Sequence, residues 1–541
     1  MPGPPARRPN GQSMRGLLNR RLLRFATFFV LGAGVTLLAG LQTGFHVIEN
    51  DFWSVLYYGR HLVLSEPASL YNGFYPIGYA FLLGRMPLEH VVELSYALNA
   101  LLAGLFVAAV TDLVSARGSV IATLLALAFS LSSRPVFHYA NTVGPDIGAA
   151  AFTALAVDLL WYDRLRGAPA GAPMLQSLLV GASLGLAMLW RTHAGVSSLL
   201  ILAAAFLLGG RRKEAWGWVA ISSFVALVSL QLAANVLSGH GVFETAQKFN
   251  IYKLFFPVNW IHPPTPEEIA GFSVLDVVAS EPQRFLDTYV PYFTSLASLA
   301  WPGLLCFLVA PARSEEERFG LFAAVSAFLY AIPLALGDSP RAPLTVMALF
   351  IAPLFVGAAV LMSRLSQTAA QRRLLRPALW ALLAAGSLIP VLGWVRTDLA
   401  LLRQNAAQHR NFLAIQEELL KHDLTSADQL FSDKYQVYLP SVLPYVPRQV
   451  GGWGMDWLWG YSAEYPEIPM SSWDAFARAS RQQGVRYLVL SPGSDYLLPE
   501  FALIYDRAYD EDVLGLEFIG VRAKMRMYRF TDPAGPVAAD A

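Results

Sequence analysis

The chain has 541 residues, of which 55% are hydrophobic and only 15% are charged, and its formal net charge is +1. Soluble domains carry roughly 25% charged residues, so this composition excludes an ordinary soluble protein and predicts an integral membrane protein with many spans. The single cysteine, Cys306, excludes an intrachain disulfide scaffold. The sequence has no basic groove interleaved with aromatic residues, and we therefore expect no nucleic-acid partner.

Apolar runs long enough to cross a bilayer recur along the chain. A spanning helix needs about 20 mostly apolar residues, and about eleven runs meet this requirement. We interpret the first run as an uncleaved helix, because many spans follow it and no clear small-residue cleavage site is present. The segment 76–88 is left open as a partial span. The predicted spans are 23–44, 89–113, 119–133, 145–162, 174–190, 194–209, 215–237, 288–311, 319–337, 342–362 and 375–396.

The basic residues predict how these spans are oriented. If the N-terminus is cytoplasmic, the cytoplasmic segments carry most of the arginines, whereas the outer turns keep isolated ones such as Arg134. This asymmetry is the positive-inside pattern. Together with the Ala-, Arg-, Gly- and Leu-rich usage, it predicts a multi-pass protein of a bacterial inner membrane. The cytoplasmic basic residues are then Arg7, Arg8, Arg15, Arg20, Arg21, Arg24, Arg117, Arg164, Arg166, Arg211, Arg212, Lys213, Arg313, Arg318, Arg364, Arg372, Arg373 and Arg376.

This orientation divides the chain into three parts. Residues 1–22 are a cytoplasmic tail, residues 23–396 are the transmembrane domain with outer loops 45–88 and 238–287, and residues 397–541 lie outside. Within the second loop, Thr265, Pro266 and Glu268 predict the N-terminus of a short helix. Helices interleaved with strands predict a small α/β domain at the C-terminus. Its expected helices are 399–421 and 472–483, and its expected strands lie near VRYLVLS, FALIYDRAY, LEFIGV and KMRMYRF.

The stretch 45–79 combines carboxylates with many aromatic residues. Glu49 and Asp51 flank Asn50 at the point where the first span should end. Carboxylates near a bilayer are costly and usually have a task. An interfacial belt would also account for the aromatic side chains. These are Phe52, Trp53, Tyr57, Tyr58, Tyr71, Phe74, Tyr75 and Tyr79.

The order of several short motifs resembles the GT-C glycosyltransferases, membrane enzymes that use polyprenyl-phosphate-linked sugars. The similarity is to the branch containing protein O-mannosyltransferases and the lipid A aminoarabinose transferase. The resemblance implies a GT-C-like fold, a polyprenyl-phosphate sugar donor, and a lipid, glycan or protein acceptor. Unlike the lipid A enzyme, the chain has no lysine after the start of the aromatic-proline segment, which leaves the phosphate-holding residue open. The matching positions are Glu49-Asn50-Asp51, the aromatic-proline segment 73–79 (GFYPIGY), Asp146, Arg191 and Arg341.

Transfer of a sugar from a lipid phosphate needs a base for the acceptor hydroxyl and cations for the departing phosphate. We expect Asp51 to be the base, because burial beside aromatic rings makes a carboxylate a better base. Glu49 or Asp146 would position the acceptor or tune Asp51, although a helix N-terminus alone would also favour Asp146. Arg191 and Arg341 can bind phosphate oxygens, and snorkelling from a helix end is the alternative. Further candidates for substrate binding are Tyr75, Arg60 and His193.

A divalent metal ion is left open as a cofactor, since carboxylates and imidazoles suit such ions but no tight ligand spacing is present. Other functions also stay open: an oligosaccharide ligase or polymerase, a flippase or transporter of lipid-linked sugars, and an export factor. A transporter should show charges in mid-span and inverted repeats, and the sequence has few such charges and no repeat. The outer residues available to a metal are His46, Glu49, Asp51, Asp146, His193, His240 and His262.

Overall fold

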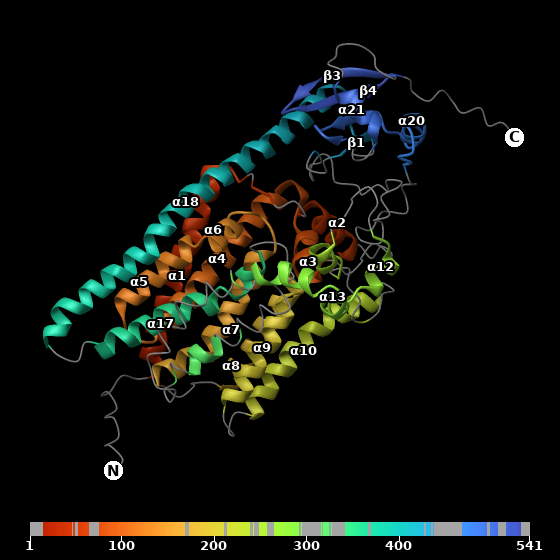
Figure 1. Ribbon diagram of the computed structural model, residues 1–541. Coiled ribbons are helices and arrows are strands. Elements are labelled where there is room, and N and C mark those ends of the chain that lie inside the picture. The colour runs from red at the N-terminus through yellow and green to blue at the C-terminus, as the bar shows by residue number, and fades with distance from the viewer. Residues whose placement is uncertain are drawn as a thin grey trace.

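The structure is a computed structural model, and the chain is mostly helical. In Figure 1 the helices form a bundle, and one long helix, α18, leads from it to a small sheet. The residues that the structure describes are 14–45, 47–48, 52–63, 75–167, 173–209, 214–237, 242, 248–256, 264–291, 294, 315, 318–323, 326, 341–365, 369–426, 429–433, 437, 468–494, 498–506 and 515–531.

The bundle is built by pairwise packing of long helices. α1 packs against α4, α4 against α7, α7 against α8, and α8 against α10. Small residues allow close approach of the first pair: a Cβ on Gly32 of α1 would lie 2.9 Å from the Cα of Gly104 in α4. The helices are α1 (Met14–Thr43), α4 (Val91–Ser115), α5 (Val120–Ser132), α6 (Arg134–Ala140), α7 (Asp146–Arg166), α8 (Pro173–Trp190), α9 (Ala194–Gly209) and α10 (Glu214–Leu237).

The described helices are those of an integral membrane protein, as the composition predicts. Among the described residues, five helices are long and apolar enough to cross a membrane, or up to six if the pair α5 and α6 forms one span. That pair is bent by 54° at Ser133, which explains why the run 119–133 is short. The prediction of about eleven spans stays a prediction, because most of 288–311 and 319–337 lies outside the described residues.

In the part of the chain that the structure describes, six shorter helices and one further candidate span, α17, complete the helical part. The predicted helix start at Thr265 is confirmed: its hydroxyl accepts a hydrogen bond from the Glu268 backbone, and the Glu268 side chain binds the Thr265 N–H. The shorter helices are α2 (Phe52–Val63), α3 (Ile77–Arg85), α11 (Lys248–Phe255), α12 (Pro266–Gly271), α13 (Val274–Ser280) and α16 (Arg341–Val346). The helix α17 (Ala348–Leu365) belongs to the candidate span Leu344–Met362.

The helix α18 (Ala369–Lys421) is continuous over 53 residues. The predicted separation of a span at 375–396 from a helix at 399–421 is wrong. No glycine or proline follows Gly393 before the helix ends. Asp398 does not start a new helix; its carboxylate accepts a hydrogen bond from Nε of Arg134 at 3.2 Å and is fully buried. At about 1.5 Å per residue, α18 is about 80 Å long.

The C-terminal residues form a four-stranded sheet of order β1-β2-β4-β3. β1 (Leu430–Ser432) and β2 (Tyr487–Leu490) are parallel, whereas β4 (Met525–Phe530) is antiparallel to both β2 and β3 (Leu516–Arg522). The helix α20 (Trp473–Gln482) precedes β2. The predicted strand FALIYDRAY is wrong, because Pro499–Asp506 forms the helix α21. Pro499 suits a first helical turn, and Phe501 and Ile504 bury one helical face.

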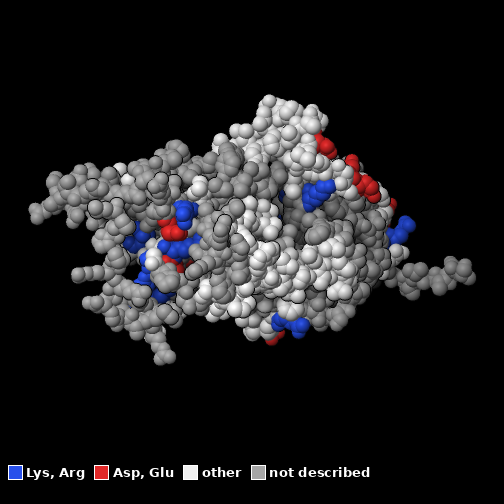
Figure 2. Space-filling view, turned by 90° about the horizontal axis from the view of Figure 1, so that it is seen from below, with Lys and Arg blue, Asp and Glu red and all other residues white. Residues whose placement is uncertain are grey.

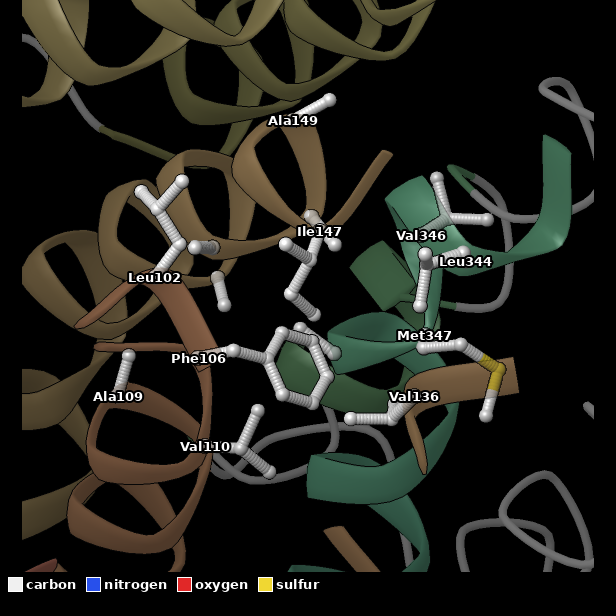
Figure 3. Packing of buried hydrophobic residues seen from close by; sticks show 14 of the residues in the cluster. Leu102, Phe106, Ala109, Val110, Val136, Ile147, Ala149, Leu344, Val346 and Met347 are labelled. Atoms are coloured by element: carbon white, nitrogen blue, oxygen red, sulfur yellow. The ribbon is translucent and has the colours of Figure 1, made fainter. Parts of the chain in front are cut away.

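The core between α4, α7 and α16 is apolar. Ile147 of α7 and Phe106 of α4 point into the space between these helices, and Leu344 of α16 joins them (Figure 3). All three side chains are fully buried. Because lipid is as apolar as these side chains, close packing rather than exclusion of water holds such a core together. This packing fixes the start of α7 beside α16.

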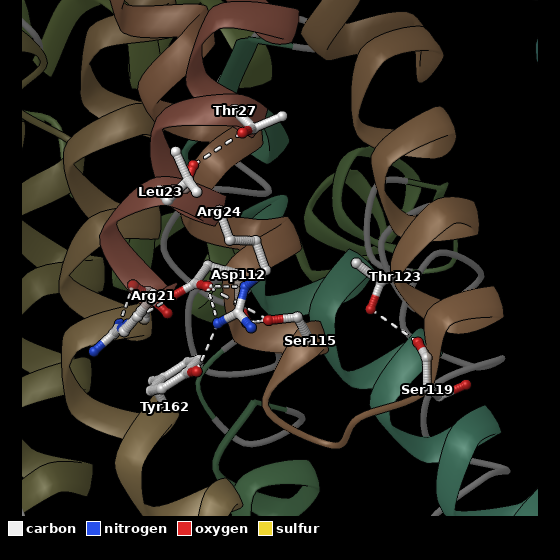
Figure 4. Close-up of polar contacts among 10 residues, drawn as sticks. Arg21, Leu23, Arg24, Thr27, Asp112, Ser115, Ser119, Thr123 and Tyr162 are labelled. Carbon is white, nitrogen blue, oxygen red and sulfur yellow. Dashed lines mark hydrogen bonds and ion pairs between the residues drawn. The ribbon is translucent and has the colours of Figure 1, made fainter. Parts of the chain in front are cut away.

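A buried ionic cluster joins α1, α4 and α7 far from the start of α7. Asp112 of α4 accepts hydrogen bonds from Nε of Arg21 at 2.7 Å and from Nη2 of Arg24 at 2.6 Å. Arg21 also binds Asp158 at 2.8 Å, and Arg24 binds the hydroxyl of Tyr162 at 2.6 Å. Figure 4 shows the arginine side chains converging on Asp112 and Tyr162. We call these five residues the Asp112 cluster.

The Asp112 cluster carries two positive and two negative charges, so its formal charge is balanced. Asp112 and Asp158 are almost completely buried, and the guanidinium carbon of Arg21 lies 3.6 Å from the centre of the Tyr162 ring. Figure 2 views the molecule from below, where one group of basic and acidic side chains gathers at the left of the view and others lie near the right and lower edges. A buried carboxylate needs such pairing, and the cluster therefore ties the first helix to its neighbours.

Candidate functional site

The candidate site lies where α1 ends, α7 begins and α8 ends, and we call this the site end of the bundle. Residues 47 and 48, which follow α1, pair with the segment before α7: Ile48 and Val143 form a parallel bridge, and the Val143 N–H donates to the Val47 carbonyl at 3.0 Å. The hydroxyl of Tyr96 contacts the Val47 backbone and lies 3.1 Å from the Asn141 carbonyl. The two segments are thus held side by side.

The predicted acidic motif follows directly on this pairing. Glu49, Asn50 and Asp51 lie outside the described residues, as does His46. The described residues on either side are Ile48, which is bridged to Val143, and Phe52, which begins α2 and is buried.

Asp146 and Arg191, which the sequence analysis selected separately, form an ion pair. Nη2 of Arg191 lies 2.8 Å from Oδ1 of Asp146, and the side chains are only 13% and 3% exposed. Asp146 is the first residue of α7, where the partial positive charge of a helix N-terminus favours a carboxylate. Arg191 follows directly after α8. A pair this buried is costly to separate, so each side chain fixes the other.

Close helix packing holds Arg191 at this place. Trp190, the last residue of α8, lies so near Gly148 of α7 that a Cβ at position 148 would collide with the indole nitrogen. The Trp190 ring also contacts Phe152 of α7 at 5.1 Å and Tyr79 of α3 at 6.3 Å between ring centres. The end of α8 is therefore enclosed by α3 and α7.

His193 extends the site towards α16. It lies in the turn between α8 and α9, and its Nε2 is 3.1 Å from the hydroxyl of Thr345 in α16. Arg341 begins α16, one helical turn before Thr345, so the structure brings its backbone to this side of the bundle. The side chain of Arg341 lies outside the described part of the structure. Thr345 was missed by the sequence analysis, since a single threonine in an apolar run carries no signal of its own.

Tyr75 and Arg60 lie around α3 but at different ends of it. Tyr75 immediately precedes α3, is buried, and contacts the Tyr58 ring at 5.7 Å between centres. Nη2 of Arg60 donates instead to the Met86 carbonyl at 2.9 Å, beyond the C-terminal end of α3. The structure thus places Tyr75 next to the start of α3, where Tyr79 contacts Trp190, and places the Arg60 guanidinium at the other end of α3.

The described residues provide no cluster of three or more His, Cys, Asp or Glu side chains that could hold a metal ion. Of the outer residues considered as ligands, Asp146 pairs with Arg191 and His193 contacts Thr345. Glu49, Asp51, His46, His240 and His262 lie outside the described residues.

The arrangement around Arg191 is suited to binding an anion. A guanidinium has five N–H donors in a planar fork, so Arg191 can bind a phosphate while it stays in contact with Asp146. An imidazole and aromatic rings stand in the adjoining turns. Such a site suits an anionic group next to an uncharged ring or chain.

The chain is similar in structure to several solved proteins. No protein-family model matches the chain, and no curated protein matches it in sequence. It is similar to ArnT from Cupriavidus metallidurans bound to undecaprenyl phosphate, with 13% identity, 97% of this chain and 100% of that chain covered, and a TM-score of 0.46. It is also similar to the archaeal oligosaccharyltransferase AglB from Archaeoglobus fulgidus in complex with an inhibitory peptide and a dolichol-phosphate. That match has 13% identity, covers 95% of this chain and 75% of that chain, and has a TM-score of 0.48.

Proposed function

We propose that the chain is a membrane glycosyltransferase that moves a sugar from a polyprenyl phosphate to an acceptor hydroxyl at the site end of the bundle. The observation that carries this proposal is the buried ion pair of Asp146 and Arg191, at 2.8 Å. A buried arginine held by a carboxylate is a pre-positioned cation, and a departing lipid phosphate needs one. The Asp112 cluster is a less suitable site, since its two arginines share Asp112, Arg21 also binds Asp158, and the cluster lies far from the candidate residues at the start of α7.

Arg191 is the proposed phosphate-binding residue, and Asp146 orients it. The guanidinium can donate two parallel hydrogen bonds to phosphate oxygens, which fixes the direction of the leaving group. Arg341 would supply a second cation, because α16 packs against α7 and the His193 contact ties it to the turn after α8. Tyr75 and Tyr79 would line the approach to this turn.

Asp51 is the proposed base. It would take the proton from the acceptor hydroxyl as the hydroxyl oxygen forms its bond to the anomeric carbon. The bond between that carbon and the phosphate oxygen breaks at the same time, the polyprenyl phosphate leaves with the electron pair, and the anomeric configuration inverts. The pairing of Ile48 with Val143 supports this role, because each of these residues precedes a candidate carboxylate by three positions.

The proposed orientation agrees with this chemistry. With the arginines Arg21 and Arg24 on the cytoplasmic side, the site end faces away from the cytoplasm. The donor would then be a lipid-linked sugar that enters from the membrane, and the sheet at the end of α18 would lie on the same outer side. The donor sugar and the class of acceptor are left to experiment.

The proposal is tested by comparing cell-envelope glycans and glycolipids by mass spectrometry in cells with the gene, without it, and with the Asp51→Asn variant. We expect one sugar-bearing product that is present only with the unaltered gene. A flippase would instead change the side of the membrane on which an existing lipid-linked sugar is found. Identical covalent products in all three strains would contradict a transferase.

A further inference from the structure

Two amide side chains interrupt the apolar sequence of α10. Gln231 and Asn235 lie one turn apart within the candidate span Gly217–Leu237, and both are buried. Residues four apart share one face of a helix. Polar side chains inside a span are costly and usually have a function. The proposed reaction does not itself require Gln231 or Asn235.

The amides form a chain of hydrogen bonds whose direction is fixed at both ends. The Ile77 N–H donates to Oε1 of Gln231 at 3.0 Å, and Nε2 of Gln231 donates to Oδ1 of Asn235 at 3.0 Å. Nδ2 of Asn235 then donates to the Val242 carbonyl at 3.1 Å. Because a backbone N–H only donates and a carbonyl only accepts, a single orientation of both amides satisfies the chain.

Gln231 supplies a helix cap that α3 lacks in its own sequence. Ile77 is the first residue of α3, and the N-cap residue Pro76 makes no side-chain hydrogen bond to the helix. The first N–H groups of any helix have no partner within it, and lipid offers none. The partner of Ile77 comes instead from α10.

The first turn of α3 also rests against the residues before Arg191. A Cβ on Gly78 would lie 2.6 Å from the Leu189 carbonyl oxygen, so the two backbones are in direct contact. The neighbouring Tyr79 contacts the Trp190 ring. Because the start of α3 is fixed by the Gln231 hydrogen bond and contacts the last turn of α8, a shift of α3 would alter the surroundings of Arg191.

We propose that Gln231 is a positioning residue for the proposed transfer: from α10 it caps α3 and holds residues 75–79 against the Arg191 turn. Asn235 keeps the Gln231 amide in the orientation that this cap needs. The inference rests on the proposed function, which gives the Arg191 turn its importance.

The test compares Gln231→Leu with Ser229→Ala in the full chain, purified into lipid nanodiscs. Ser229 is a matched control, since it lies on the same helix, is exposed, and donates only within α10, to the Ala226 carbonyl at 2.7 Å. In Gln231→Leu we expect hydrogen exchange of the first-turn amides of α3 to rise by about three- to tenfold, the range for a hydrogen bond between membrane helices. We expect a similar loss of affinity for undecaprenyl phosphate, and neither change in Ser229→Ala.

Asn235→Leu provides a second variant that keeps Gln231 but removes its orienting partner, and we expect smaller changes in the same direction. Unaltered exchange of α3 in both variants would overturn the cap. Faster exchange with unaltered binding of undecaprenyl phosphate would overturn the positioning role. If the unaltered protein fails to bind undecaprenyl phosphate, the proposed function fails, whereas the exchange comparison still decides whether Gln231 caps α3.

Discussion

Asp146 and Arg191 lie at opposite ends of consecutive helices, yet their side chains meet at 2.8 Å. Asp146 begins α7 and Arg191 follows the end of α8, so the antiparallel packing of these two helices brings the carboxylate and the guanidinium together. Neither charge is left alone in the apolar bundle. The pair therefore has a structural role as well as the proposed catalytic one, and the two roles can be separated.

Asp146→Asn and Arg191→Gln should each destabilise the protein by about 3–5 kcal/mol, because each leaves an unpaired buried charge. The double variant should recover most of that loss, since both charges are then removed. Transfer activity should stay lost in the double variant, because no guanidinium remains for the phosphate. Thermal unfolding in detergent and a transfer assay measure the two effects. Recovery of transfer in the double variant would show that Arg191 does not hold the phosphate.

Gly148 should be sensitive to a single added methyl group. The Cβ of Gly148→Ala would collide with the Trp190 indole, and overpacking of this kind costs about 1–3 kcal/mol. Gly34→Ala is a matched control, because Gly34 is also helical and its Cβ would meet nothing within 4 Å. Adding Trp190→Leu should relieve the collision and restore part of the melting temperature. Equal melting temperatures for the two alanine variants would contradict the close packing of α7 and α8.

The Asp112 cluster predicts a stability effect without a direct effect on the chemistry. Asp112→Asn should cost about 3–5 kcal/mol, because both Arg21 and Arg24 lose their shared carboxylate inside the bundle. The exposed pair of Arg284 and Glu281 is the control, and Arg284→Gln should change stability by about 1 kcal/mol or less. Melting temperatures of the purified variants measure this contrast. Similar small losses in both would mean that the cluster does not bind α1 to α4.

The membrane class could be read from the sequence, because the apolar runs that predict spans recur as long apolar helices. The pairing of Asp146 with Arg191 could not, since it depends on how α7 and α8 pack. Arg60 is an arginine like Arg191 and lies in the predicted outer loop 45–88 with Asp51. Its side chain binds the backbone carbonyl of Met86, and no sequence pattern reveals this contact. Gln231 did carry a signal, because an amide inside an apolar span needs a partner.

The errors in secondary structure have local causes. The run FALIYDRAY has strand-forming residues, but Pro499 and the helical spacing of Phe501 and Ile504 favour the helix α21. The division of α18 near residue 397 assumed that a span ends where polar residues begin. The helix continues because Asp398 pairs with Arg134 and nothing after it interrupts the backbone.

The proposed base predicts a separation of folding from chemistry. Asp51→Asn should lower transfer by about 10²- to 10⁴-fold, the usual contribution of a general base, while the protein stays folded in the membrane. Asp474→Asn is the control, since Asp474 is an exposed carboxylate on α20. Transfer rates and the elution profile in detergent check the two statements. Full activity of purified Asp51→Asn would remove Asp51 from the role of base.

The proposed orientation predicts which residues an impermeant reagent can reach. In a Cys306→Ser background, we expect Ser471→Cys to react with a membrane-impermeant maleimide in intact spheroplasts, because Ser471 is exposed beside α20. Arg166→Cys, at the exposed end of α7 opposite Asp146, should react only after the membrane is permeabilised. The physical reason is the excess of arginine on the cytoplasmic side. Labelling of Arg166→Cys but not Ser471→Cys in intact spheroplasts would contradict the proposed orientation. Asp146 and Arg191 would then lie on the cytoplasmic face, where nucleotide sugars rather than lipid-linked sugars are available as donors.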